Sequence, residues 1–266
     1  MFFEVTRQAY YKGLKQRIAL CQQEEEITNL VLGIRCNHKR MGGKKLYGLL
    51  GDKIHRYKSV MGRDKFFDLL RRKGLLVKRR RKYAVTTQSR HRFRVHQNLV
   101  KDYTPQGPHR VWVSDITYIR TGNGFKYLFL ITDAYSRKIV GWELSNSLGL
   151  EGALKSLKMA LKQCTDPTGL IHHSDRGFQY CSYEYVKRIQ SKGGRMSMGE
   201  AGNCYDNAKA ERVNGILKDE YGLDEHFKED KHANQAVREA IYLYNEQRPH
   251  WSLGLRIPSE VHKSGS

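Results

Sequence analysis

The sequence predicts an α/β fold, with a mixed sheet of five strands flanked by helices and a small helical region before it. Two observations lead to this prediction. After residue 110, runs of β-branched and aromatic residues separated by turn residues give three strands in succession, and helix-like and strand-like segments then alternate. Before that point, apolar residues recur at helical spacing and the charge is strongly positive. The 266 residues suffice for a core domain of about 150 residues and a smaller domain.

The first 77 residues are predicted to form helices. Over residues 3–32 the apolar positions fit a helix, which Gly33 is expected to end. A second helix is predicted where four apolar side chains share one face, namely Leu46, Leu49, Leu50 and Ile54. A third covers residues 63–73, and Gly74 is suited to end it because glycine tolerates the left-handed backbone of a helix C-terminus.

The third predicted helix is basic, and together with the second it resembles a helix-turn-helix. Many small helical bundles share this pattern, so a solvated bundle is the alternative. The contacts with DNA are expected to come from the cations of the third helix, which are Arg63, Lys65, Arg71 and Arg72.

A basic linker is predicted at residues 78–109, between the helical region and a second domain over residues 110–262. It is rich in Arg, Lys, Thr, Gln and Ser, as suits a chain that lies along phosphates. Residues 1–109 hold 26 basic and 8 acidic residues, a net charge of +18, whereas the remainder holds 22 and 19, a net of +3. The first part is therefore expected to bind a polyanion. Its densest cations are Lys78, Arg79, Arg80 and Arg81.

In the second domain, the order of the predicted elements indicates the fold. The expected elements are strands at 111–120, 125–135 and 136–145, a helix at 149–163, a strand at 170–173, a helix at 180–191, a strand at 195–198, helices at 206–218 and 231–246, and an irregular tail at 247–261. Gly and Asn in the turn between the first two strands favour a hairpin. Three antiparallel strands followed by alternating helices and strands is the order of the ribonuclease-H-like fold.

Three carboxylic acids stand where such a fold would bring them together. Asp115 lies within the first predicted strand among apolar residues, where an ionised carboxylate is costly unless something compensates it. Asp175 follows the strand at 170–173. Glu211 comes after 35 intervening residues on the helix at 206–218, and the residues on its side of that helix are Asn207, Ala210 and Asn214. Each acid alone is more often structural, but together they predict one site.

Such a site is expected to bind metal ions. Carboxylates from two strands and one helix would repel each other and raise one another's pKa values unless cations bind. Carboxylate oxygens suit hard divalent cations, here Mg²⁺ or Mn²⁺. Two such ions ~4 Å apart would activate a water or a 3′-hydroxyl and stabilise the leaving oxygen of a phosphodiester. The predicted catalytic residues and metal ligands are Asp115, Asp175 and Glu211.

Five motifs carry a resemblance to a known family. They are WVSDITY at 112–118, TDAYSR at 132–137, HHSDRGFQY at 172–180, DNAKAE at 206–211 and YNEQRPH at 244–250. With the spacing of the second and third acids, they resemble the DDE catalytic core of bacterial insertion-sequence transposases and retroviral integrases. The similarity is strongest to the second-reading-frame product of the family whose transposase is assembled from two overlapping frames. It covers nearly all of residues 110–262, and the helical region matches less sharply.

The resemblance implies a polynucleotidyl transferase that integrates DNA. Water would first free a 3′-hydroxyl at an element end, and that hydroxyl would then attack a phosphodiester. The implied partners are the inverted repeats at the element ends, target DNA and further copies of the chain, with a first-reading-frame protein as another candidate. On the catalytic helix, Asn207 is expected to support Glu211 or to contact DNA. For Lys209, Arg212 and Lys218, a solvated helix face is an equal alternative to phosphate contact.

Two other functions stay open at this point. One is a ribonuclease-H-like nuclease without strand transfer, and the other is a non-catalytic DNA-binding regulator of transposition, which the three intact acids disfavour. The five cysteines show no CxxC pair and no zinc-ligand spacing, which indicates free thiols in a reducing compartment. No apolar run approaches the length of a membrane span, and no signal peptide is recognisable. A location in the bacterial cytoplasm or nucleoid is therefore expected.

Overall fold

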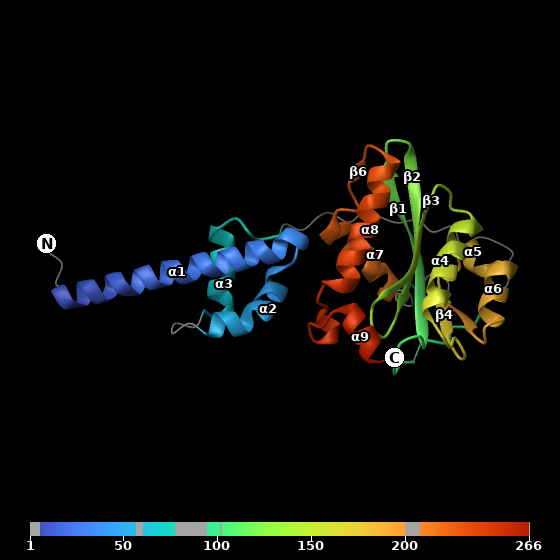
Figure 1. Ribbon diagram of the computed structural model, residues 1–266, viewed down its shortest axis with the longest axis horizontal. Coiled ribbons are helices and arrows are strands. Elements are labelled where there is room, and N and C mark those ends of the chain that lie inside the picture. The colour runs from blue at the N-terminus through green and yellow to red at the C-terminus, as the bar shows by residue number, and fades with distance from the viewer. Residues whose placement is uncertain (1–5, 57–60, 78–94, 102, 200–207, 266) are drawn as a thin grey trace. The chain divides into compact units, whose positions relative to one another are not determined.

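The computed structural model describes residues 6–56, 61–77, 95–101, 103–199 and 208–265. The chain divides into two compact units, Met1–Arg80 and Arg81–Ser266, and each is considered by itself (Figure 1). Among the residues so described, no helix is both long and apolar enough to cross a membrane.

The first unit is built from three helices, which are α1 (Arg7–Asn37), α2 (Gly43–His55) and α3 (Arg63–Arg72). Its core forms where these helices meet, and its largest buried side chains include Ile27, Leu46 and Phe66. The prediction that Gly33 ends the first helix is wrong. Glycine inside a helix costs only about 1 kcal/mol relative to alanine, and the next turn still packs Ile34 against the core. Tertiary packing therefore carries α1 through to Asn37.

The second and third helices agree with the sequence. Leu46, Leu50 and Ile54 are buried, and Leu49 packs against them more loosely. Gly74 has φ +67°, and the amide of the residue after it, Leu75, donates to the Leu70 carbonyl at 2.7 Å, so α3 ends with the expected left-handed glycine. Arg72 on α3 forms an ion pair of 2.7 Å with Glu24 on α1.

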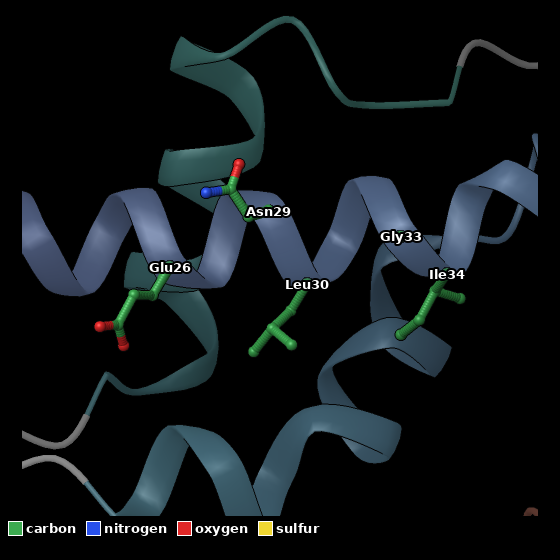
Figure 2. Close-up of a pocket in the computed structure, with 5 residues that line it drawn as sticks. All are labelled: Glu26, Asn29, Leu30, Gly33 and Ile34. Carbon is green, nitrogen blue, oxygen red and sulfur yellow. The ribbon is translucent and has the colours of Figure 1, made fainter.

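An open groove of about 590 Å³ runs beside α1. In Figure 2, Leu30 and Ile34 point to the same side of the helix, Asn29 points to the other, and Gly33 leaves a gap in the wall. Glu26 completes the lining. A ligand site needs several polar groups that converge, and this groove offers only two from a single helix.

The second unit is organised around one mixed sheet. Its strands are β1 (Val111–Thr121), β2 (Gly124–Asp133), β3 (Ile139–Ser145), β4 (Ile171–Ser174) and β5 (Arg195–Met198). The order across the sheet is β3-β2-β1-β4-β5. The first three strands are antiparallel, and β4 and β5 run parallel to β1. The five predicted strands are thus present, and the short β6 (His226–Phe227), which was not predicted, pairs with the end of β1.

Helices cover both faces of this sheet (Figure 1). One face is covered by α4 (Leu150–Gln163), α5 (Phe178–Cys181) and α6 (Tyr183–Gln190), with Trp112 and Phe129 in the core between them. The other face is covered by α7 (Ala208–Tyr221) and α8 (Asp230–Glu246). Helix α7 therefore approaches the sheet from this second face, and its buried side chains point towards the strands.

Two segments of the second unit differ from the prediction. The helix expected at 180–191 is two helices, because Ser182 adopts an extended backbone and its hydroxyl accepts a hydrogen bond from the Tyr185 amide, which caps a new helix. The tail expected to be irregular contains a 3₁₀ turn (Trp251–Leu253) and α9 (Pro258–Ser264). A proline in the first turn starts α9 favourably, and burial of Val261 stabilises it.

Residues 95–101, at the end of the predicted linker, lie against the second unit. The Leu99 amide donates to Ser197 Oγ at 2.8 Å, and Leu99 and Val100 pack against the apolar residues Val111 and Ala210. Residues 78–94 of the predicted linker, including Lys78, Arg79, Arg80 and Arg81, lie outside the described residues. Residues 95–101 thus join the core that holds the acids.

Candidate active site

The strand register places two of the predicted acids side by side. Strand β1 pairs in parallel with β4, and Val113 lies opposite His173. Asp115 and Asp175 each come two residues after this pair, Asp115 within β1 and Asp175 just past the end of β4, and the charge of Asp175 raises the pKa of Asp115, so the two carboxylates are near each other. Each acid comes four residues after the first residue of its strand, and this equal spacing brings the two acids together.

Glu211 reaches the same region from α7. One turn later on that helix, Asn214 is buried, and its Nδ2 donates to Asp115 Oδ2 at 2.7 Å. Residues three apart on a helix point to nearly the same side, so Glu211 is turned towards Asp115 as well. Glu211 itself stays exposed.

The negative charges of the carboxylates in this region repel each other. The pKa of Asp115 is raised to about 7, first by burial and then by the neighbouring charge of Asp175. Hydrogen bonds from the Ile116 amide and from Asn214 act in the opposite direction, and the charge of Glu211 adds a smaller upward effect. The ionised site consequently needs a positive charge to balance it, either a proton or a cation.

The donor set suits a hard divalent cation. Asp115, Asp175 and Glu211 offer carboxylate oxygens, and Asn214 Oδ1 is buried and accepts no hydrogen bond from the described part of the chain. Within residues 6–56, 61–77, 95–101, 103–199 and 208–265, however, no three His, Cys, Asp or Glu side chains are grouped closely enough to hold a metal ion. The residues therefore have suitable chemistry, with Glu211 less closely involved than the two aspartates.

A tight turn fixes Asp175. Its Oδ1 accepts a hydrogen bond of 3.0 Å from the Gly177 amide. A Cβ atom at position 177 would lie 3.0 Å from this same oxygen, closer than side-chain carbons normally approach. Glycine at this position thus lets the backbone hold the carboxylate.

Comparisons with known proteins point to one family. Models of the integrase core domain match residues 105–204 and 192–258. The chain is 37% identical over 261 residues to a 31 kDa protein of insertion element IS600 from Shigella sonnei, covering 97% of this chain and 94% of that protein. It is also 38% identical over 189 residues to a transposase of insertion sequence IS3A from Escherichia coli, covering 70% of this chain and 66% of that protein.

The chain belongs to the family of bacterial insertion-sequence transposases with an integrase core.

A solved structure supports the fold of this transposase family member. A chain of the simian T-cell lymphotropic virus intasome, solved in complex with the PP2A regulatory subunit B56 gamma, superposes with a TM-score of 0.51 at 19% identity, covering 84% of this chain and 71% of that chain. At that identity the likeness concerns the fold alone. The α/β prediction of a ribonuclease-H-like, integrase-type core with a mixed sheet is thereby confirmed.

The two histidines before Asp175 belong to the core. His172 Nε2 lies 2.9 Å from Ser114 Oγ and 3.0 Å from the Tyr185 hydroxyl, and burial lowers the pKa of His172 to about 3. His173 Nδ1 lies 2.9 Å from Ser197 Oγ, and both rings are fully buried. His172 is therefore neutral, and the two rings brace strands β1, β4 and β5.

Asp133 has the structural role expected of a turn residue. Its Oδ1 accepts hydrogen bonds from the amide and hydroxyl of Ser136, and its Oδ2 accepts one from the His109 amide. All of these contacts lie at the end of β2, so they fix the β2–β3 turn.

The predicted DNA-contact residues lie in different places. On α7, Lys209 and Arg212 are exposed, while Lys218 is half-buried, and its pKa is lowered by burial but raised by the charge of Asp115. Lys218 thus extends the line of Glu211 and Asn214 at the site. Asn207 lies outside the described residues.

The cations of α3 are placed in the first unit. Arg63 pairs with Asp64, Arg71 with Asp68, and Arg72 with Glu24. Lys65 is exposed. Three of these four predicted contacts are therefore already engaged with acids of their own unit.

Sequence reasoning assigned no role to Asn214. It placed the residue on the side of the helix that carries Glu211, and this spacing was the available signal. Its hydrogen bond spans 99 residues of sequence, so the partner could not be found from local pattern.

Proposed function

We propose that this chain binds the ends of its insertion sequence and catalyses metal-dependent 3′-end cleavage and strand transfer. Asp115, Asp175 and Glu211 are the catalytic residues in this proposal. The observation that carries it is the meeting of Asp115 with Asp175 across β1 and β4, opposite Asn214 and Glu211 on α7. Membership of the transposase family makes DNA the substrate.

The proposed reaction has two steps at one site. Water attacks phosphorus at an element end, and the bond to the 3′-oxygen breaks, so that this oxygen leaves as a hydroxyl. The new 3′-hydroxyl then attacks phosphorus in target DNA, and the 3′-oxygen of the target strand leaves in turn. When bound, two Mg²⁺ or Mn²⁺ ions would help to ionise the attacking hydroxyl and to stabilise the leaving oxygen.

Residues of the chain have separate tasks in this scheme. The three carboxylates hold the cations, and Asn214 keeps the Asp115 carboxylate in its orientation. Lys218 lies on α7 close to Asp115 of β1, and it is suited to bind a phosphate of the scissile strand. The positive charge of residues 1–109, which includes the cations of α3 and Lys78–Arg81, holds the DNA with a marked dependence on salt.

Further partners follow from the family. The proposed assembly is a multimer of this chain on the element ends, and the structural neighbour described as a viral intasome supports an assembly of this kind. A first-reading-frame protein is proposed as an additional partner, and the bacterial cytoplasm or nucleoid as the location.

One assay tests the proposal. The protein is incubated with Mg²⁺ and labelled DNA that carries its own element ends, and released 3′-hydroxyls and joined products are measured. Glu211→Gln should lower joining by a factor of about 10³ or more, because a charged ligand is lost. Asp219→Asn is the matched control, since it removes an exposed acid from the same helix.

The outcomes separate the alternatives. Joining that persists in Glu211→Gln contradicts the proposed site. Nicking without joining favours a nuclease, and binding without cleavage favours a non-catalytic regulator. Repeating the assay with the first-reading-frame protein shows whether that partner is required.

A further inference from the structure

Helix α1 carries a second apolar face, which is exposed. Its packed face includes Ile27 and Val31, which are buried against α2 and α3. Tyr11, Leu14 and Ile18 are 49%, 41% and 51% exposed. At about 100° per residue, they lie on roughly the opposite side of the helix from the packed face. The N-terminal half of α1 also extends past α2 and α3 within this unit (Figure 1).

The exposed face has the spacing of a coiled-coil seam. Residues 7, 11, 14, 18, 21 and 25 are separated alternately by four and three positions, which is the a/d pattern of a heptad. The side chains in this order are Arg7, Tyr11, Leu14, Ile18, Cys21 and Glu25. Cys21 is exposed as well. The seam thus consists of four less polar side chains with a cation at one end and an anion at the other.

We propose that this seam pairs with the same seam of a second copy of the chain, in antiparallel orientation. Leu14 then faces Ile18 of the second copy, and Tyr11 faces Cys21. At each end, Arg7 faces Glu25. Residues 7, 14 and 21 then occupy d positions and residues 11, 18 and 25 occupy a positions. Each facing pair thus joins an a position with a d position, as antiparallel helix pairs require.

The charges decide the orientation. A parallel pair in register would bring Arg7 against Arg7 and Glu25 against Glu25, which is unfavourable twice. The antiparallel pair replaces both repulsions with two Arg7–Glu25 ion pairs. Arg7 already lies over the Tyr11 ring at 5.8 Å, on the seam. The neighbouring Glu24 is engaged with Arg72 of its own unit and is not needed.

The pair is expected to be weak on its own. Its 19 residues are about 28 Å long, and Lys15 and Arg17 beside the seam repel their counterparts. Such a contact would join two chains through their first units without involving the carboxylates. The inference is therefore independent of the catalytic assignment, and it is tested without metal or DNA.

A disulfide can report the register. In the full chain carrying Cys36→Ser and Cys204→Ser, Cys21 is the exposed cysteine of the described part. Adding Tyr11→Cys should give covalent dimers with oxidised glutathione, and mass spectrometry should find the link between positions 11 and 21. Gln8→Cys, exposed on the same helix but off the seam, is the matched control and should crosslink at least about tenfold more slowly.

Two crosslinking results would overturn the proposal. A Cys21–Cys21 link in the background without Tyr11→Cys means parallel pairing, because the antiparallel pair separates these thiols by about 15 Å along the helix. Equal crosslinking of Tyr11→Cys and Gln8→Cys means random collision.

Charge reversal tests the ends of the seam. In sedimentation experiments on the cysteine-containing full chain under reducing conditions, Arg7→Glu or Glu25→Arg alone should raise the dimer dissociation constant about tenfold, since two ion pairs become repulsive. The double variant should restore it. A chain that stays monomeric at every concentration, or a double variant as weak as the single ones, contradicts the antiparallel pair.

Discussion

At the scale of single residues, Asn214 connects helix α7 with the central strand β1. Its Nδ2 donates to Asp115 at 2.7 Å, while its own carbonyl oxygen is buried and has no hydrogen-bond donor in the described part of the chain. A buried amide with one unsatisfied oxygen is uncommon, because the loss of hydration is not compensated. This oxygen is suited to accept from a water bound in the active site.

Replacing Asn214 should affect the use of metal more than the fold. We expect Asn214→Ala to lower strand transfer about 10- to 100-fold, as is typical when a residue that orients a metal ligand is removed. The Mg²⁺ concentration needed for half-maximal activity should rise. Titrating activity with Mg²⁺ measures this effect, and Asn234→Ala on α8 is the control. An unchanged Mg²⁺ requirement would show that Asn214 does not position Asp115.

Single residues also show how far the site can be predicted. The three acids were predicted from their flanking residues, from the spacing of the second and third acids and from the family resemblance, and their role as metal ligands stays a prediction. The register Val113–His173 then explains why two of them meet. The hydrogen bond of Asn214 and the constraint at Gly177 depend on atoms brought together by folding, so no sequence pattern reported them.

At the scale of elements, the position of α7 is fixed from several sides. Val213, Ile216 and Leu217 form an apolar stripe and are buried against the sheet. At its C-terminal end, Glu220 accepts two hydrogen bonds, of 2.8 and 2.7 Å, from the buried Arg248. A buried charged pair of this kind contributes mainly to geometry, because desolvation offsets much of its attraction.

On the other face of the sheet, close packing between β3 and α4 can be tested by mutation. A Cβ atom on Gly141 would overlap the Ser156 carbonyl oxygen, which belongs to the backbone of α4. We expect Gly141→Ala to lower the free energy of unfolding by about 1–3 kcal/mol or more, because neither backbone can move without strain. Thermal unfolding followed by tryptophan fluorescence measures this, since all three tryptophans lie in the second unit.

Gly215→Ala on α7 is the matched control. A Cβ atom there meets no atom within 4 Å, and alanine favours a helix by up to about 1 kcal/mol. This variant should therefore be as stable as the parent or more so. If both variants were equally stable, the contact between β3 and α4 would not be as close as described.

At the scale of the whole molecule, charge is divided between the two parts of the chain. The net charge of +18 belongs to residues 1–109, whereas the part that holds the acids is nearly neutral. A site that concentrates carboxylates repels DNA until cations are bound. In the proposed function, the basic part of the chain therefore supplies the attraction for DNA that the part with the acids lacks.

This division predicts which cations control the salt dependence of DNA binding. Replacing Lys78, Arg79, Arg80 and Arg81 together with Gln should reduce the slope of log K against log salt by roughly 3 to 4, because each phosphate contact contributes about 0.9. Fluorescence anisotropy at several salt concentrations measures the slope. The control removes four exposed cations of the α4 and α6 side, which are Lys158, Lys162, Lys187 and Lys192. Equal slopes in both variants would refute the prediction.

The sequence by itself determined the order of strands and helices, the α/β class and the candidate acids, because these follow from local periodicity and from motifs that are continuous in the chain. Only the tertiary structure decided what depends on distant contacts. It carried α1 past Gly33, formed α9 in the tail and laid residues 95–101 on the core. In each case burial or a hydrogen bond to a residue far away in sequence outweighs a weak local preference.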